Sequence, residues 1–394
     1  MIYEPSDDTD LLLEQVTKYA HGAVLEIGAG SGVLAEAAAQ KEEVRAVLAV
    51  DIDKDAIRHC QEHAVSKKIQ WKVSDLFSAV TEKFDTILFN PPYLPYDRRE
   101  DEEVRRVTTG GKRGYELTER FLNSVNEHLT RDGIVLLLFS SLTGREKINE
   151  ILQNNLLDHE EISSRKIPFE TLYVYKISKN YFDKILDDKG CRNIRRLAKG
   201  HRGLIFTANQ KKGRFTRLLT IKIQRWDIAA KGTVNNEITM LKKLNKKGIG
   251  PILIDHGENF FIYEFVPGRF ILDYLQSASK AETRKVLLDV FSQMYTMDVM
   301  HFNKEEMHHP VKHVIVTPRK KATLVDFERC KPTHKPHNVT QFCQFVTSAL
   351  VQPILATKGI IIDKGEMMRR AAAYKRTLSK ADYNAILALV QIFI

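Results

Sequence analysis

Apolar and polar positions alternate along the first 180 residues with two different periods. Apolar, β-rich runs predict strands at 23–28, 46–52, 69–75, 84–92, 133–140 and 171–178. Helical patterns lie between them, at 33–40 and 53–65. Near-continuous apolar strands separated by helices are typical of a parallel sheet that helices cover on both faces. The pattern therefore predicts an α/β domain with a doubly wound sheet over residues 1–180.

The pattern changes after a charged stretch at 181–190, which we interpret as a linker. Short strand-like runs come first, at 203–208, 217–223 and 260–266, and helix-like segments follow from residue 270. A strand–turn–strand pattern at 313–327 interrupts the helices. Strands early and helices late are typical of an α+β domain with two lobes. We therefore predict a second domain over residues 191–394.

Composition is that of a soluble globular protein, with 43% hydrophobic and 28% charged residues among 394. No apolar run reaches the roughly 18 residues that a membrane-spanning helix needs. The N-terminus is acidic and does not have the pattern of a secretory signal. The four cysteines never stand in C-x-x-C spacing, which favours a reducing compartment and offers no zinc site. We expect a cytoplasmic protein that is not embedded in a membrane.

Charge is distributed unevenly between the two predicted domains. Residues 1–180 hold 23 Lys and Arg against 31 Asp and Glu, whereas residues 181–394 hold 37 against 19. The overall net charge of +10 is thus the sum of an acidic part and a strongly basic part. Because a basic surface suits a polyanion, the second half is a candidate for contact with RNA or the ribosome.

Three glycines follow the first predicted strand, in the segment EIGAGSG at 26–32. Glycine allows the tight turn and the close approach of the backbone to a ligand that this position requires in nucleotide-binding sheets. Asp51 ends the next apolar run, where an acidic side chain can accept hydrogen bonds from ribose hydroxyls. The pattern predicts a site for a dinucleotide or for another adenosine-bearing cofactor.

The tetrapeptide NPPY at 90–93 ends another apolar run. Its two prolines make a rigid loop at the carboxyl edge of the predicted sheet, where open α/β sheets bind ligands. The Asn90 side chain and a proline carbonyl can accept the two hydrogens of a planar amino group, and the Tyr93 ring can stack on that group. This motif favours an adenosine-bearing cofactor other than a dinucleotide.

Residues 1–180 resemble the class I methyltransferases that depend on S-adenosylmethionine. More narrowly, they resemble the HemK-type release-factor glutamine methyltransferases, in the branch that modifies archaeal and eukaryotic factors. The segments that carry the resemblance are YEPSDDTDLLLE at 3–14, EIGAGSG at 26–32 together with NPPY, and GGKRGYELTERFL at 110–122. The resemblance implies that the protein transfers a methyl group to the glutamine of a release factor's Gly-Gly-Gln motif.

The resemblance also assigns roles to individual residues. It implies that the cofactor is bound by Glu26, Gly28, Gly30, Gly32, Asp51, Asp75 and Leu76. It implies that the substrate amide nitrogen is held by Asn90, Pro91 and Tyr93. Such a site aligns and polarises a weak amide nucleophile next to an already activated methyl group, so it needs no strong base. The family further implies a small zinc-binding activator subunit as partner.

Two other classes of methyl acceptor remain as alternatives. The NPPY loop also occurs in adenine amino-methyltransferases that act on DNA or RNA, because the exocyclic amine of adenine is likewise a planar, weakly nucleophilic amino group that must be aligned with the methyl donor. A protein lysine is a further alternative. The acidic charge of residues 1–180 argues against a nucleic-acid substrate, although the basic second half can compensate.

A second constellation lies in the basic half. Lys222 stands in an apolar run, and Glu237 follows fifteen residues later in a helix-patterned segment. Protein kinases use such a pair to position nucleotide phosphates. FIYEFVPG at 261–268 resembles a kinase hinge, and Asp326 in LVDFE stands at the position of the metal-binding Asp of D-F-G. Residues 190–394 therefore resemble the small atypical kinases of the RIO type and the kinase of the tRNA-threonylcarbamoylation complex, and most closely a predicted archaeal Ser/Thr kinase family.

This second resemblance implies ATP and Mg²⁺ as ligands of Lys222, Glu237 and Asp326, with Asp326 on the metal. One part of the kinase pattern is missing, since His308 and His313 stand at the positions of the catalytic-loop Asp and Asn. Loss of that Asp removes a proton acceptor, and loss of the Asn weakens a magnesium position. The sequence favours a nucleotide-binding or scaffolding pseudokinase and leaves an active kinase open.

Overall fold

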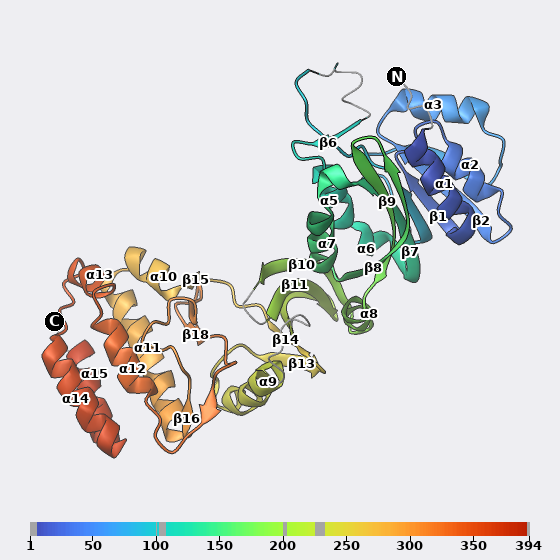
Figure 1. Ribbon diagram of the computed structural model, residues 1–394. Helices are drawn as coiled ribbons and strands as arrows, with labels where there is room; N and C mark the ends of the chain where they lie inside the picture. Colours follow the sequence, from blue (N-terminus) through green and yellow to red (C-terminus); the bar gives the residue numbers. More distant parts are fainter. Residues whose placement is uncertain (1–5, 100, 102–107, 200–202, 225–232, 392–394) are drawn as a thin grey trace. The chain divides into compact units, whose positions relative to one another are not determined.

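The computed structural model describes residues 6–99, 101, 108–199, 203–224 and 233–391. Residues 3–5, which begin the first segment of the methyltransferase resemblance, lie outside the described residues. The chain forms two compact units, Met1–Arg195 and Arg196–Ile394 (Figure 1).

The first unit is built on a seven-stranded sheet with strand order β3-β2-β1-β4-β7-β9-β8. Its strands are β1 (Gly22–Ile27), β2 (Val44–Asp51), β3 (Ile69–Val73), β4 (Phe84–Phe89), β7 (Leu129–Ser140), β8 (Leu157–Ile167) and β9 (Glu170–Lys179). Its helices are α1 (Asp7–Tyr19), α2 (Val33–Ala39), α3 (Lys54–His63), α5 (Glu116–Leu122), α6 (Val125–His128), α7 (Arg145–Asn154) and α8 (Tyr181–Asp188). The apolar runs and helical patterns predicted for this half are confirmed as strands and helices.

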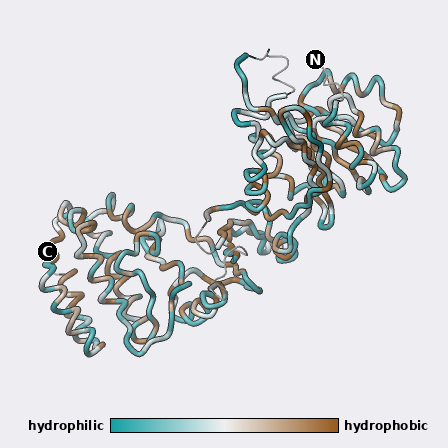
Figure 2. The backbone as a smooth tube through the Cα atoms, viewed as in Figure 1, coloured by the Kyte–Doolittle hydropathy of each residue, from teal (hydrophilic) through white to brown (hydrophobic). Residues whose placement is uncertain are grey.

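Helices cover both faces of this sheet (Figure 1). On one face, Leu12 of α1 packs in a buried cluster with Val24 of β1. On the other face, Phe121 of α5 packs in a separate cluster with Leu25 of β1. Successive side chains of a strand point to opposite faces of a sheet, so two neighbouring residues of β1 serve different cores. Figure 2 shows the hydrophobic segments inside the unit and hydrophilic segments outside. The predicted doubly wound arrangement is confirmed.

The prediction of a parallel sheet holds from β3 to β7 and does not extend to one edge. Strand β9 pairs antiparallel with both β7 and β8. The pattern LDHEEISSRKI at 157–167 did not predict β8, because most of its side chains are polar and at least partly exposed. An edge strand with solvent on one side does not need the apolar run that marks a central strand.

The segment at 181–190, interpreted from sequence as a linker, contains helix α8. The side chain of Asn180 caps this helix by accepting a hydrogen bond from the Asp183 backbone N–H, at 3.0 Å. Strand β10 (Cys191–Lys199) follows directly, and the boundary between the two units falls within it.

The second unit contains a five-stranded sheet with strand order β10-β11-β12-β14-β13. After β10, its strands are β11 (Gly203–Lys212), β12 (Phe215–Gln224), β13 (Leu253–Gly257) and β14 (Phe260–Glu264), with α9 (Thr233–Leu244) between β12 and β13. The later helices are α10 (Ile271–Ser277), α11 (Lys280–Val299), α12 (Asn338–Val346), α13 (Gln352–Ala356), α14 (Lys364–Thr377) and α15 (Lys380–Gln391). Short strands between them are β15 (Arg269–Phe270), β16 (Phe302–Asn303), β17 (Val314–Val316), β18 (Ala322–Leu324) and β19 (Lys331–Pro332). The expected order of early strands and late helices is confirmed. Within the described ranges, every helix is too short or too polar to cross a bilayer.

One buried carboxylate ties three helices of the second unit together. Asp298 near the end of α11 is fully buried and accepts hydrogen bonds from the Asn338 backbone N–H at 2.9 Å and side-chain amide at 2.7 Å. It also accepts from the Val339 N–H at 3.1 Å and from the Tyr374 hydroxyl of α14 at 3.0 Å. Because a buried carboxylate is costly unless its oxygens are satisfied, these four donors make Asp298 a specific anchor between α11, α12 and α14.

We predict that Asp298→Ala lowers the free energy of unfolding of the second unit by about 3 kcal/mol, because it leaves buried donors unsatisfied. The measurement is the unfolding transition in urea, followed by circular dichroism. Asp273→Ala on the exposed side of α10 is the matched control, with an expected change below about 0.5 kcal/mol. Equal effects of the two substitutions would contradict this account.

Candidate functional site

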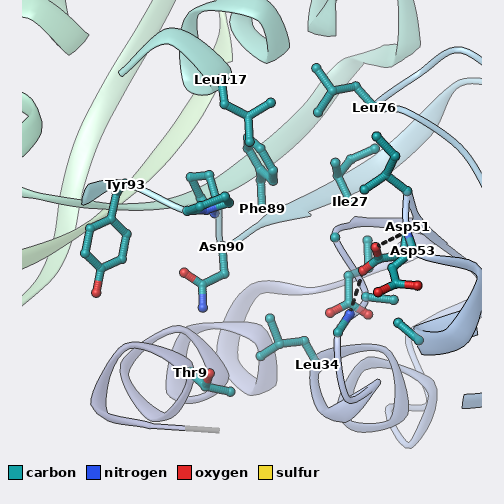
Figure 3. A pocket seen from close by; sticks show the side chains of 18 of the residues that line it. Thr9, Ile27, Leu34, Asp51, Asp53, Leu76, Phe89, Asn90, Tyr93 and Leu117 are labelled. Carbon is teal, nitrogen blue, oxygen red and sulfur yellow. Dashed lines mark hydrogen bonds between the residues drawn. The ribbon is translucent and has the colours of Figure 1, made fainter. Parts of the chain in front are cut away.

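A cavity of about 320 Å³ opens in the first unit where β1, β2 and β4 end (Figure 3). Parallel neighbours bring their carboxyl ends to the same edge of a sheet, so the loops that follow these strands share one site. The sequence-predicted residues that line it are Glu26, Gly28, Gly30, Asp51, Asp75, Leu76, Asn90, Pro91 and Tyr93. Gly32 does not line it. This glycine precedes α2 with a φ of +81°, and a Cβ there would lie 2.8 Å from the Trp71 ring.

The glycine turn after β1 holds its backbone open toward the cavity. Gly28 has a φ of +74°, and a Cβ built on it would meet nothing within 4 Å. A side chain there would therefore occupy ligand space, and it would also strain the backbone. The turn is fastened to β2, since the N–H groups of Gly28 and Ala29 both donate to the Val50 carbonyl.

Asp51 is held in one orientation by two backbone groups. Its Oδ2 accepts from the Gly30 N–H at 2.9 Å, and its Oδ1 accepts from the Asp53 N–H at 2.8 Å (Figure 3). A carboxylate has about four lone-pair positions, so two acceptor positions remain for hydroxyl donors of a ligand.

Glu26 lies buried beneath the glycine turn. Among the described residues its Oε2 has no hydrogen-bond partner. Burial raises the pKa of Glu26 well above its ordinary value, and the Asp51 charge adds to this, while a hydrogen bond from the Ala35 backbone acts in the opposite direction. An unsatisfied buried carboxyl oxygen beside a cavity is costly, and it is best explained by a donor or cation that belongs to a ligand.

Asn90 follows β4 and is oriented by a residue that the sequence analysis did not identify. Its Nδ2 donates to Oδ2 of Asp8 at 3.2 Å, and Asp8 is a buried residue in the first turn of α1. The Asn90 Oδ1 is buried and has no partner within the described residues. Figure 3 shows Asn90 between Tyr93 and the Asp51 side of the cavity. The side chain therefore presents a free acceptor oxygen to a ligand, while its amino group is already engaged.

Asp75, expected at the adenine ring, is paired with a cation. Arg120 of α5 approaches its Oδ2 at 2.8 Å, and both residues line the cavity. Neither Arg120 nor Asp8 was predicted as a site residue. Arg120 lies in segment 110–122 and Asp8 in segment 3–14, both of which carry the family resemblance. Their place in these segments is the signal in the sequence that could have identified them.

The second unit brings Lys222, Glu237 and Asp326 together, as the sequence predicted. The Lys222 Nζ lies 2.6 Å from Glu237 Oε2 and 3.3 Å from Asp326 Oδ1. Burial acts to lower the Lys222 pKa, but the two carboxylates outweigh burial and raise it. Glu237 also accepts from the Phe327 backbone N–H at 2.9 Å. The ammonium group is therefore charged and fixed between α9 and the turn after β18.

The two histidines at the kinase catalytic-loop positions lie in different surroundings. His308 is exposed, whereas the His313 ring is mostly buried and its Nδ1 lies 3.9 Å from Asp326 Oδ2. Burial lowers the pKa of His313. No group of three His, Cys, Asp or Glu side chains in the described part of the chain could hold a metal ion by itself.

Comparison with known proteins places the first unit in a family. The methyltransferase small domain family matches residues 5–167. A Methanocaldococcus jannaschii protein named as a protein N5-glutamine methyltransferase is 41% identical over 179 residues, which are 44% of this chain and 89% of that protein. Human methyltransferase HEMK2 is 30% identical over 193 residues, 45% of this chain and 90% of the relative. The Schizosaccharomyces pombe eRF1 methyltransferase catalytic subunit is 28% identical over 204 residues, 45% of this chain and 88% of the relative.

Sequence identity of 30% or more over about nine tenths of a relative's length establishes family membership. The chain belongs to the HemK-type release-factor glutamine methyltransferase family. Its first unit has the class I methyltransferase fold, and the family's methyl donor is S-adenosylmethionine.

We predict that Asp8→Ala lowers the kcat of methyl transfer by roughly 10- to 100-fold, because Asn90 loses the partner that orients it. The KM for S-adenosylmethionine should change little. Asp8→Asn keeps an acceptor oxygen and should retain most of the activity. Incorporation of labelled methyl groups measures these effects.

Asp10→Ala is the matched control, because Asp10 is an exposed residue of the same helix. Equal losses in Asp8→Asn and Asp8→Ala would show that the charge of Asp8, and not the orientation of Asn90, is what matters.

Proposed function

We propose that the first unit methylates the side-chain amide of the glutamine in the Gly-Gly-Gln motif of a peptide-chain release factor. The observation that carries this proposal is the Asn90 amide, anchored by Asp8 on one side and with a free buried Oδ1 on the other. Relatives named as release factor glutamine methyltransferases support the choice of glutamine. The same geometry would serve an adenine amino group, and a protein lysine is the remaining alternative.

The cavity suits S-adenosylmethionine. Its volume lies at the lower end of the range for small-molecule sites. The unpartnered Glu26 oxygen and the nearby Asp51 carboxylate favour a cationic ligand, and the open space at Gly28 leaves room for its methionine end. We assign the ribose hydroxyls to Asp51 and the adenine to Asp75 and Leu76. Gly32 supports the turn from outside the cavity.

The bound cofactor supplies a methyl group on a positively charged sulfur, which is activated for transfer. The chain's own task is to present the weakly nucleophilic amide nitrogen in line with that methyl group. Asn90 Oδ1 and the carbonyl of Pro91 accept the two N–H hydrogens, while the Tyr93 ring packs on the planar amide. These acceptors gain strength as positive charge develops on the nitrogen, so no strong base is required.

We further propose that the first unit works with a small zinc-binding activator subunit. The fission yeast relative is named as a catalytic subunit, which supports a partner of this kind. Strands β3 and β8 form the two edges of the sheet. An edge strand offers unpaired backbone groups, so a partner can bind there by adding a strand.

We predict that Asn90→Ala abolishes methylation of a purified release factor, with a loss of at least about 100-fold, because the amide loses its side-chain acceptor. Gln61→Ala is the matched control, since Gln61 is an exposed amide residue of α3. Mass spectrometry of the acceptor peptide locates the methyl group. Full activity of Asn90→Ala, or methylation of RNA, DNA or lysine in place of glutamine, would contradict the proposal.

We propose that the second unit is an atypical kinase-like module that binds ATP. The buried Lys222–Glu237 pair beside Asp326 supports this, because a fixed ammonium group can contact nucleotide phosphates. Magnesium typically uses one or two protein carboxylates plus phosphate oxygens, so Asp326 suffices as a protein ligand. We propose the corresponding division into an N-terminal methyltransferase domain and a C-terminal kinase-like domain.

We predict that Lys222→Ala weakens ATP binding in the presence of Mg²⁺ by at least about tenfold, because the phosphates lose a charged partner. Isothermal titration of the full-length chain measures this affinity. Lys246→Ala, at an exposed lysine after α9, is the control and should bind as the wild type does. Unchanged binding by Lys222→Ala would contradict the assignment.

We also propose that the basic half contacts RNA or the ribosome through the β11–β12 hairpin. The exposed residues Lys211, Lys212 and Arg214 surround its tip, and the neighbouring Phe215 is 80% exposed. Cations next to an exposed aromatic ring suit single-stranded nucleic acid. The test is whether RNA affinity of the full chain falls with added salt.

A further inference from the structure

The loop between β16 and β17 carries a carboxylate that the sequence analysis did not consider. Glu306 Oε2 lies 3.1 Å from Nε2 of His313, and its Oε1 is bonded to Arg329. The Glu306 side chain is 39% exposed, so it faces both this polar cluster and solvent. Two of its four lone-pair positions are used, and the others remain available to a ligand.

Buried hydrogen bonds to α12 hold the backbone on both sides of Glu306. The Lys304 N–H donates to Asn338 Oδ1 at 2.7 Å, and the Lys304 carbonyl accepts from Gln341 Nε2 at 3.2 Å. The N–H of Met307, a fully buried residue, donates to Gln341 Oε1 at 3.1 Å. The position of Glu306 is therefore determined by packing and not by solvent.

The backbone of Glu306 is itself strained. Its φ is +71°, a value that residues other than glycine rarely adopt. Such strain persists only where the surroundings enforce it, and it is concentrated at functional sites. Asp326 shares the feature, with a φ of +62°. Two carboxylates on strained backbone thus lie on either side of the mostly buried ring of His313.

Contacts connect Glu306 to the proposed nucleotide site. His313 lies between Glu306 and Asp326, with its Nδ1 3.9 Å from Asp326 Oδ2. Asp326 in turn lies 3.3 Å from the Lys222 Nζ, and its carbonyl accepts from the buried Lys304. The cationic residues Lys222 and Lys304 are buried. The side chains of Glu306 and Asp326 are 39% and 43% exposed. The carboxylates therefore form the accessible surface of the cluster.

We propose that Glu306 is the proton acceptor of a phosphoryl-transfer reaction in the second unit. In kinases this role belongs to the catalytic-loop Asp, at whose position the sequence pattern places His308. This inference rests on the proposal that the second unit binds ATP with Mg²⁺. His308 is exposed. Glu306, two residues earlier in the chain, contacts His313, and the Nδ1 of that histidine lies 3.9 Å from Asp326. The second unit is accordingly an active enzyme and not a pseudokinase.

The reaction balances with ATP as donor and a hydroxyl group as acceptor. The hydroxyl oxygen forms a bond to the γ-phosphorus, and the bond from that phosphorus to the β,γ-bridging oxygen breaks. The electron pair of the broken bond leaves with ADP, and the hydroxyl proton passes to a carboxylate oxygen of Glu306. Proton acceptance of this kind contributes typically 10²- to 10⁴-fold to a rate. The acceptor hydroxyl is an alcohol side chain of a protein, or water if no protein acceptor is present.

The experiment uses the full chain with γ-labelled ATP and Mg²⁺. It measures released inorganic phosphate and label on the chain itself, together with the Kd for ATP. Glu306→Gln keeps the size and one acceptor oxygen, so turnover should fall at least about 100-fold while Kd stays within about twofold. Glu306→Asp keeps a carboxylate and should show more turnover than Glu306→Gln. This second variant keeps the role of the carboxylate testable if the glutamine variant folds poorly.

Glu305→Gln is the matched control, since Glu305 is the neighbouring carboxylate and pairs with Lys331 at 2.8 Å. It should retain wild-type turnover. A wild-type chain that binds no ATP would show that the kinase-like function itself is wrong. ATP binding without turnover, or turnover unchanged in Glu306→Gln, would overturn the role of Glu306 and leave nucleotide binding intact.

Discussion

The methyltransferase site depends on one constraint, which is that β1, β2 and β4 run parallel and end at the same edge of the sheet. Their registers align Ile27 of β1 with Val50 of β2 and Phe89 of β4. The glycine turn follows β1, Asp51 is the last residue of β2, and Asn90 follows β4, so they meet although up to 62 residues separate them in the chain. In the described strands of this sheet, antiparallel pairing lies on the far side of β7, where it leaves this edge intact.

Buried charge has a similar role in both units. A buried ionisable group is costly unless it has partners, and it therefore specifies which groups must surround it. Asp8 orients Asn90, and Glu26 leaves one oxygen for a cationic ligand. In the second unit Lys222 and Glu237 satisfy each other. In the first unit, one oxygen each of Glu26 and Asn90 stays without a partner among the described residues, next to the cavity.

The uneven charge of the chain lies in different structural settings in the two units. The acidic half contains a cavity whose lining includes the carboxyl groups of Glu26, Asp51 and Asp75. The basic half has its cations both in a buried cluster and on an exposed hairpin. Net charge alone could not reveal this difference in setting, because it does not distinguish buried ion pairs from exposed cations.

Local sequence determined the strands, the glycine turn, the NPPY loop and the strand-lysine and helix-glutamate pair, because each depends on residue type and short-range period. Tertiary structure decided three things that spacing could not. Strand β8 forms at a sheet edge without an apolar pattern, and Asp8 reaches Asn90 across 82 residues. Glu306 lies beside His313, because α12 holds the loop in a strained turn that no linear spacing encodes. Sequence by itself determined which residue types stand at each candidate site, and packing between distant segments decided which of their side chains meet.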